Sequence, residues 1–401
     1  MTAWGQGLEN PVSERLRDPA STGYVAIFLG ALAAFLAIPP IEARSPTWPI
    51  AIGIVAIALG IWTATRGRRR LGWGAAVAGL LGIGLGILAT RSGTGNLETV
   101  FDTTLIAQTF GLATPLVFGA IAGMFSERSG VVNIGLEGMM LMGAFWGLYG
   151  SDRGGTWVVG LLLGMASGGL LALVLAFFAI HLRADQIVAG FAINFLALGI
   201  TGYFFQQFYN GQVTGNISVV PNLHIAGLGN FFEGSIGDLS ILTWASFVLV
   251  ILAYVVLFKT PVGLRIRACG EHPRAADTVG INVYLVRYCC VVLSGLLVAI
   301  GGVYLSLGPQ GNGTFIFNIT SGKGFIALAA MIFGNWRPAG AFAAALLFGF
   351  SSALALKLQV YSSQAATLFQ ILPYVLTLVA LAGVIGRTVA PAADGKPYAK
   401  Q

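Results

Sequence analysis

The residues that could do chemistry inside this chain are few, and three of them interrupt long apolar runs. Asn133 and Glu137 lie four residues apart in a glycine-rich stretch, and Asn194 lies in a second apolar run. If these runs cross a membrane, such side chains must face a bundle interior or a wet cavity. We predict that all three line a solute path. The alternative reading is that the carboxylate caps backbone amides and the two amides bond neighbouring helices.

Catalytic and metal chemistry are not predicted. The three cysteines have no metal-ligand spacing and are too few for a disulfide framework, so we interpret them as packing residues. The Gly322-Lys323 pair lacks the upstream glycine and the following hydroxyl of a phosphate-binding loop. We therefore expect a chain that is not an enzyme, with no catalytic residues, cofactor or metal, and with any ATP bound by a partner subunit.

The composition indicates what holds these residues. The chain has 401 residues, of which 56% are hydrophobic and 9% are charged, against about a quarter charged in globular proteins. The sequence therefore predicts an all-α polytopic membrane protein with roughly 10–12 segments, some of them short and discontinuous. Apolar runs lie at 22–38, 49–64, 71–90, 104–125, 130–149, 156–180, 187–206, 239–258, 284–307, 339–356 and 367–386, with a shorter one at 324–334.

The distribution of basic residues predicts the orientation. With a cytoplasmic N-terminus and every run crossing, 17 of the 22 lysines and arginines lie inside, as the positive-inside rule requires. This count needs 324–334 to cross. We expect both termini in the cytoplasm and the net charge of +7 on the cytoplasmic face, in contact with anionic lipid and not with nucleic acid.

Two segments have a broken character. Residues 129–140 carry Asn133 and Glu137 among glycines, and residues 320–334 follow a long polar lead-in. Backbone that is not fully helical is tolerated at membrane depth only inside protein or along a cavity. We predict paired discontinuous helices about a central site, in an inverted repeat. Four glycines should supply their conformational freedom: Gly135, Gly138, Gly322 and Gly324.

The loop at 259–283 contains a short helix. Pro273 suits its first position and Gly280 the position just past its end. Two turns are unstable alone, so we predict a docking helix that presents Ala275 and Ala276 to another surface. The alternative is an ordinary basic loop, which would explain its arginines.

Several motifs resemble one family. These are the run from Ala113 to Phe118, the run from Ser126 to Ala144, and shorter matches at 263–268, 275–281 and 322–330. The chain is similar over about 104–386 to permeases of branched-chain amino acid and ribose ABC importers, in their nucleoside branch. Asn133, Gly135, Glu137 and Gly138 match the core of the family motif.

The resemblance implies a type II-like permease fold and a coupling helix that inserts into a cytoplasmic ABC ATPase. The general coupling motif has a glutamate before the paired alanines, where this chain has Arg274. The residues that we expect to serve coupling are Arg265, Arg267, Glu271, Ala275, Ala276 and Gly280.

The resemblance also implies partners and a substrate. It predicts a second homologous permease subunit in a heterodimer, the ATPase, and an extracytoplasmic binding lipoprotein that delivers nucleosides to the bacterial plasma membrane. Sugars or branched-chain amino acids stay open as substrates, and so do an ion-coupled carrier and a membrane scaffold. The expected regions are a tail (1–21), extra membrane segments (22–103), the permease core (104–386) with its coupling loop (259–283), and a cytoplasmic tail (387–401).

Overall fold

The computed structural model describes residues 19–36, 47–91, 103–213, 217–224, 235–361 and 388–399. The chain divides into two compact units, residues 1–102 with 354–387 and residues 103–353 with 388–401. The predicted boundary falls at 103/104, and the predicted core extends to 386. The predicted segment at 367–386 and the terminal residues 1–18 lie outside the described residues.

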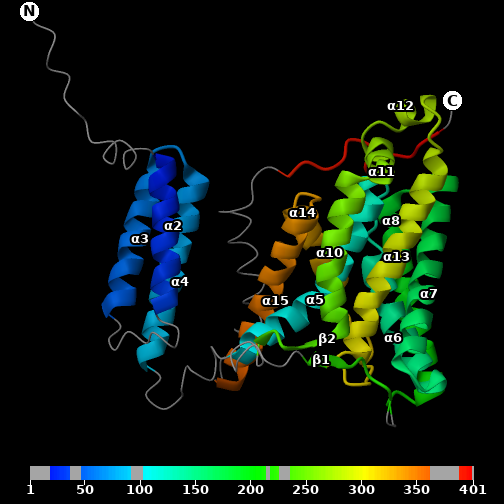
Figure 1. Ribbon diagram of the computed structural model, residues 1–401, viewed down its shortest axis with the longest axis horizontal. Coiled ribbons are helices and arrows are strands. Elements are labelled where there is room, and N and C mark those ends of the chain that lie inside the picture. Colours follow the sequence, from blue (N-terminus) through cyan, green and yellow to red (C-terminus); the bar gives the residue numbers. More distant parts are fainter. Residues whose placement is uncertain are drawn as a thin grey trace, which may run out of the picture. The chain divides into compact units, whose positions relative to one another are not determined.

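The first unit contains three apolar helices. They are α2 (Pro19–Leu36), α3 (Thr47–Thr65) and α4 (Arg69–Arg91), shown in blue in Figure 1. Their glycines allow close backbone approach: a Cβ on Gly60 of α3 would lie 2.7 Å from the Gly72 carbonyl oxygen of α4. Small residues at helix contacts are typical of packing in lipid, where hydrophobic burial gives little drive for association.

The second unit is the helical core. Its long helices are α5 (Thr103–Arg128), α6 (Leu136–Gly154), α7 (Trp157–Ala176), α8 (Gln186–Tyr209), α10 (Ile241–Lys259) and α13 (Val283–Leu307), together with α15 (Pro338–Tyr361) as far as Ala353. Its shorter elements are η2 (Phe177–His181), α11 (Pro261–Glu271), α12 (Pro273–Thr278) and α14 (Lys323–Phe333). Two three-residue strands, β1 (Asn222–His224) and β2 (Asp238–Ser240), pair antiparallel.

Six helices of the described residues are long and apolar enough to cross a membrane. They are Thr104–Arg128, Trp157–His181, Gln186–Tyr209, Ile241–Lys259, Val283–Leu307 and Pro338–Lys357. Side-chain caps fix several helix starts: Asp185 accepts from two amides at the start of α8, and Asn282 accepts from one at the start of α13. The predicted all-helical, multi-pass membrane architecture is confirmed.

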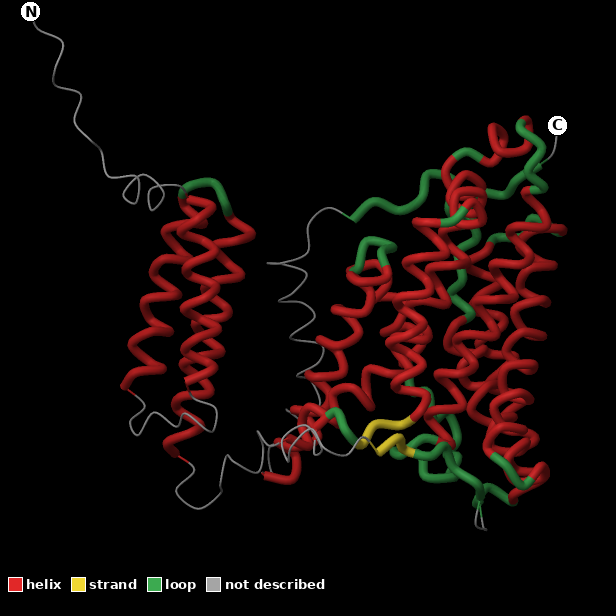
Figure 2. Tube along the Cα trace, in the orientation of Figure 1, coloured by secondary structure: helices red, strands yellow, loops and turns green. Residues whose placement is uncertain are grey.

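The core has two distinct ends. One end carries α11 and α12, with the last turns of α5, α10 and α14; we call it the α12 end (Figure 1). The opposite end carries the β1–β2 hairpin, as the yellow strands in Figure 2 show. The sequence did not predict the hairpin.

Two predicted spans have different bounds in the structure. The span at 130–149 becomes helical only at Leu136, because residues 129–135 form an irregular segment. The span at 104–125 continues as α5 to Arg128. Glu127 therefore lies inside a helix long enough to cross a membrane, and it is 3% exposed. The predicted end of this span at 125 left Glu127 outside it, because the polar residues from Ser126 onward obscured the last turn of α5.

Candidate functional site

The candidate site is the place where the N-termini of α6 and α14 meet through one carboxylate. Glu137 lies in the first turn of α6, and its Oε1 and Oε2 accept hydrogen bonds from the amides of Gly322 and Gly324, at 2.7 and 2.6 Å. These amides belong to the N-terminus of α14, and the first N–H groups of a helix have no carbonyl partner within the helix. We call this contact the Glu137 junction. It joins the two segments that the sequence predicts to be discontinuous.

Glycine makes the junction sterically possible. A Cβ on Gly324 would lie 2.5 Å from both the Cα and the backbone nitrogen of Glu137. Gly322 has a φ of +85°, in the left-handed region that residues with a side chain rarely adopt. Lys323 lies between the two glycines and directs its ammonium to the Thr320 carbonyl oxygen, at 3.4 Å. The Glu137 carboxylate, the Gly322 and Gly324 amides and the Lys323 ammonium thus all lie at the first turn of α14.

Asn194 braces the irregular segment from α8. Its Oδ1 accepts a hydrogen bond from the Gly138 amide at 2.8 Å, and its Nδ2 donates to the Ile134 carbonyl at 3.0 Å. A Cβ on Gly138 would lie 2.9 Å from the Asn194 Cα, so glycine again permits the approach. The amide replaces the helical partners that the backbone of residues 129–135 lacks.

Asn133 lies at the centre of the core and is fully buried. Its Nδ2 donates to the Ser294 hydroxyl of α13 at 3.1 Å, while its Oδ1 has no partner among the described residues. A buried acceptor without a partner costs free energy, so this oxygen is a polar group whose hydrogen bonding the described residues leave incomplete. At the next motif residue, Gly135, a Cβ would lie 3.1 Å from the Ile193 side chain of α8.

Several residues that hold the irregular segment were missed by sequence reasoning. Gln186 Oε1 accepts from the Val132 amide at 2.8 Å, and the Ser126 hydroxyl donates to the Val131 carbonyl at 2.7 Å. Arg287 of α13 donates to the Ser129 carbonyl at 3.2 Å. Ser126 lies in the family motif, but its type alone does not indicate this bond. Gln186 and Arg287 lie 54 and 158 residues away from the groups that they bind, so no local pattern could have indicated them.

We expect Asn194→Ala to destabilise the core. The substitution leaves the Gly138 amide and the Ile134 carbonyl without their partner, and an unsatisfied buried group costs about 1–3 kcal/mol. The matched control is Phe195→Ala on the same helix, because the Phe195 side chain is 71% exposed. Thermal unfolding of the detergent-solubilised protein checks the prediction, and equal melting temperatures for the two variants would contradict it.

The predicted short helix in the 259–283 loop is confirmed. Pro273 is its first residue, and Gly280, with a φ of +85°, follows its last turn. Ala275 is exposed, but Ala276 is 3% exposed and packs against Cys269, among others. The prediction that both alanines face outward is wrong for Ala276, because adjacent helical residues point about 100° apart.

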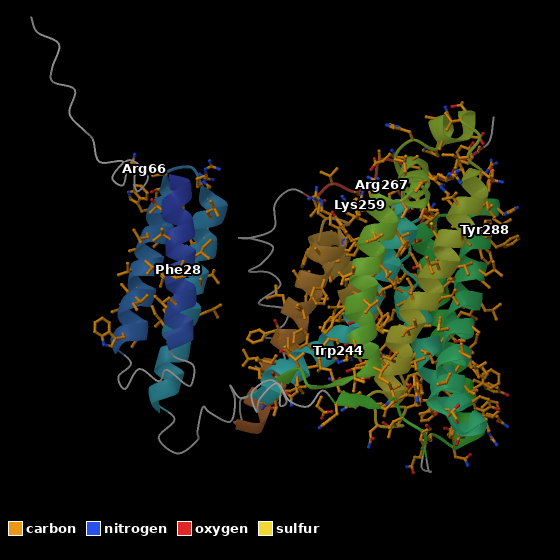
Figure 3. The ribbon with its side chains drawn as sticks, in the orientation of Figure 1. Phe28, Arg66, Trp244, Lys259, Arg267 and Tyr288 are labelled. Carbon is orange, nitrogen blue, oxygen red and sulfur yellow. The ribbon has the colours of Figure 1, made fainter. Side chains whose placement is uncertain are left out.

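The other predicted coupling residues lie on α11. Arg265 is exposed, and the Arg267 guanidinium lies over the Phe258 ring at 5.1 Å. Figure 3 shows Arg267 beside Lys259 at the α12 end, whereas Trp244 lies at the other end of α10. Glu271 accepts a hydrogen bond from the Ala392 amide at 3.1 Å. The structure brings these residues together at one end of the core, and their role in coupling stays a prediction.

A second buried polar group lies toward the hairpin end. The hydroxyl of Thr114 on α5 donates to Thr243 on α10 at 3.0 Å, and Thr243 donates to the Tyr304 hydroxyl of α13 at 3.4 Å. All three residues are at most 2% exposed. The three hydroxyls come from helices that are distant in the sequence, so no local sequence pattern indicates that they meet.

Comparison with known proteins places this geometry in a family. Residues 105–381 match the model of the permease component of branched-chain amino acid transport systems. The chain is 45% identical over 314 residues to the guanosine ABC transporter permease protein NupQ of Bacillus subtilis, covering 74% of this chain and 96% of NupQ. It is 39% identical over 317 residues to the nucleoside ABC transporter permease protein NupC of Lactococcus lactis, with the same two coverages.

A more distant relative comes from Bacillus subtilis, the organism that also has NupQ. The guanosine ABC transporter permease protein NupP of Bacillus subtilis is 26% identical over 259 residues, which cover 61% of this chain and 71% of NupP. No solved structure matches the chain. The family match covers α6, α14, the Glu137 junction between them and the α11–α12 loop. It leaves out α2, α3 and α4. The chain therefore belongs to the family of permease components of branched-chain amino acid transport systems, and it is a transport subunit and not an enzyme.

Proposed function

We propose that this chain is the permease subunit of an ATP-driven importer that moves nucleosides into the cytoplasm. The observation that carries the proposal is the similarity to NupQ and NupC along almost their whole length. The buried amides and hydroxyls of the core suit a polar, uncharged solute. Asn133, with its unpartnered oxygen, is the residue that we expect to meet it.

The proposal includes three kinds of partner. A second permease subunit is supported by NupP, which is also named as a guanosine permease in the organism that has NupQ. A cytoplasmic ATPase would bind ATP, and an extracytoplasmic lipoprotein would deliver the nucleoside. We assign the α12 end to the cytoplasm, because most basic residues of the core lie at that end, on its short helices, at helix ends and in its loops.

The Glu137 junction is our candidate for the moving part. The long helix α6 and the short helix α14 begin at the same carboxylate and extend toward opposite ends of the core. A shift of α14 that breaks the two hydrogen bonds between Glu137 and the Gly322 and Gly324 amides would separate the N-terminus of α14 from that of α6. Packed elements of this kind switch between discrete arrangements instead of deforming continuously. Nucleotide binding at the ATPase would favour the arrangement in which the ATPase binds the nucleotide more tightly.

Uptake of radiolabelled guanosine into proteoliposomes tests the function. The vesicles hold this chain with its second permease and the ATPase, and the lipoprotein is added outside. We expect uptake that needs ATP inside and is reduced by excess unlabelled adenosine or cytidine, but not by ribose or leucine. Inhibition by ribose or leucine alone would reassign the substrate. Uptake by the isolated chain under a sodium or proton gradient would favour an ion-coupled carrier.

Ala275→Trp should uncouple transport from ATP hydrolysis. Ala275 is exposed and small on the outer face of α12, so a large ring there obstructs docking without disturbing the buried Ala276 face. We expect uptake and substrate-stimulated ATPase activity to fall at least tenfold while the melting temperature is unchanged. The matched control, Ala275→Ser, keeps the residue small and should transport as the parent does. Normal uptake by Ala275→Trp would contradict α12 as the coupling helix.

A further inference from the structure

Residues 388–399, which we call the strap, lie along the α12 end and are fastened to the last turn of α11. The Ala393 amide donates to the Gly270 carbonyl at 2.8 Å, and the Ala392 amide donates to the Glu271 carboxylate at 3.1 Å. Gly270 and Glu271 lie at the helix C-terminus, where carbonyl groups lack partners within the helix. The strap therefore satisfies the Gly270 carbonyl and is anchored to the C-terminus of α11 by two hydrogen bonds.

The strap also reaches α12 and α13 through its aromatic residue. Tyr398 is 7% exposed, and its ring lies 5.5 Å from that of Tyr284 on α13. Its hydroxyl is hydrogen-bonded to the Asp277 carboxylate of α12. Ala276 and Cys269 complete a small apolar cluster with the ring. A single side chain thus binds both short helices of the loop to the first turns of α13.

Arg287 connects the strap to the irregular segment. The guanidinium is buried, with the residue 2% exposed. Its Nη1 donates to the Lys396 carbonyl at 3.1 Å, and its Nε donates to the Ser129 carbonyl at 3.2 Å. A buried cation is costly unless its N–H groups are bonded. These two carbonyls satisfy Nε and Nη1, whereas Nη2 has no partner among the described residues. The strap and the start of residues 129–135 are therefore tied to one rigid group.

A second connection leads to α14. The Asp394 carboxyl of the strap interacts electrostatically with the buried Glu127 carboxyl of α5, and burial raises the pKa of Asp394 to about 7. Glu127 accepts from the Trp336 indole N–H at 2.6 Å, and Arg128 donates to the Trp336 carbonyl at 2.8 Å. Trp336 follows α14 and has a φ of +51°, a strained value for a bulky residue that its surroundings must maintain.

Both connections end at the Glu137 junction. Residues 129–135 lead directly into α6 and Glu137. The α14 helix has 11 residues, about 16 Å at 1.5 Å per residue, and it extends from the Trp336 turn to the amides that Glu137 binds. A displacement at the α12 end would thus reach the junction from both sides.

We propose that the strap transmits movement of α11 and α12 to the Glu137 junction, with Arg287 as the positioning residue that links it to residues 129–135. This inference rests on the proposed function, in which α12 receives the movement of the ATPase. It assigns to a C-terminal segment a mechanical role that the family resemblance does not contain.

The test uses the reconstituted complex with three variants of this chain. One ends at Arg387, one carries Tyr398→Ala, and one carries Arg287→Lys. We expect guanosine uptake per ATP hydrolysed to fall at least tenfold in the first two and about threefold in the third, which retains the charge. ATPase activity itself should persist. The matched control is Val389→Ala, because the Val389 side chain is 70% exposed and should leave uptake unchanged.

Hydrogen exchange gives a readout that does not depend on transport. In the parent complex, ATP should change exchange at both 261–280 and 129–137. In Tyr398→Ala, the change at 261–280 should remain and the change at 129–137 should disappear. A change retained at both places, with normal uptake per ATP, would overturn the strap proposal. If the parent complex takes up no nucleoside, the proposed function fails instead, and the exchange comparison still decides the role of the strap.

Discussion

Replacing Glu137 by glutamine should both destabilise the core and slow transport. Glutamine retains one oxygen for the Gly322 or Gly324 amide but directs an N–H₂ donor at the other amide. A hydrogen bond to a charged group contributes about 1.5–3 kcal/mol, so we expect a loss of about 2–3 kcal/mol in unfolding free energy. Glu137→Ala, which loses both bonds, should lose about twice as much. Thermal unfolding of the purified protein measures both.

The transport measurement separates the two readings of Glu137. Uptake is normalised to the amount of folded complex at a temperature below either transition. If the junction moves during transport, Glu137→Gln should reduce this normalised rate at least fivefold. A lower melting temperature with a normal rate would make the carboxylate purely structural. A variant that melts and transports as the parent does would show that the two amide bonds do not form.

Gly324→Ala should have an effect of similar size. Its Cβ would lie 2.5 Å from the backbone of Glu137, a distance at which backbone atoms on one side must move. Overpacking a tight site costs about 1–3 kcal/mol, and the displaced Gly324 amide also loses its bond to Oε2. We expect a lower melting temperature and a loss of uptake of at least tenfold, measured on the same preparations.

The control for this substitution is Gly199→Ala. Gly199 lies in the interior of α8, and a Cβ there would meet no atom within 4 Å. Alanine has the higher helix propensity, by about 0.8–1 kcal/mol, so this variant should be unchanged or slightly more stable. If Gly324→Ala behaved like Gly199→Ala, the close approach of α14 to α6 would not exist.

The sequence was informative where a local pattern decides the structure. Apolar runs of sufficient length predicted the long helices, because lipid leaves the backbone few alternatives. Asn133 and Glu137 among glycines predicted the break before α6, and Pro273 with Gly280 predicted both ends of α12. In each case the signal lies within a few residues of the feature that it indicates.

The sequence was uninformative where partners are distant in the chain. Glu137 binds amides 185 and 187 residues away, and no periodicity relates such positions. Glu127 was excluded from its helix because the polar residues of its last turn lower the local hydropathy. The prolines and charges of the strap are typical of a solvated tail, although at least six of its residues are bonded to or packed against the core. Its structure depends on carbonyls and rings that only the assembled helices provide.

The Glu137 junction has an electrical consequence. Its negative charge is met by two peptide amides and by the nearby ammonium of Lys323, which interacts with it electrostatically. Moving one unpaired charge through a potential of 100 mV involves about 2.3 kcal/mol, whereas opposite charges that move together involve almost none. A shift of α14 that breaks the junction would carry Lys323 away from Glu137, so its free energy would depend on the membrane potential. Uptake by the reconstituted complex should then change with an imposed membrane potential.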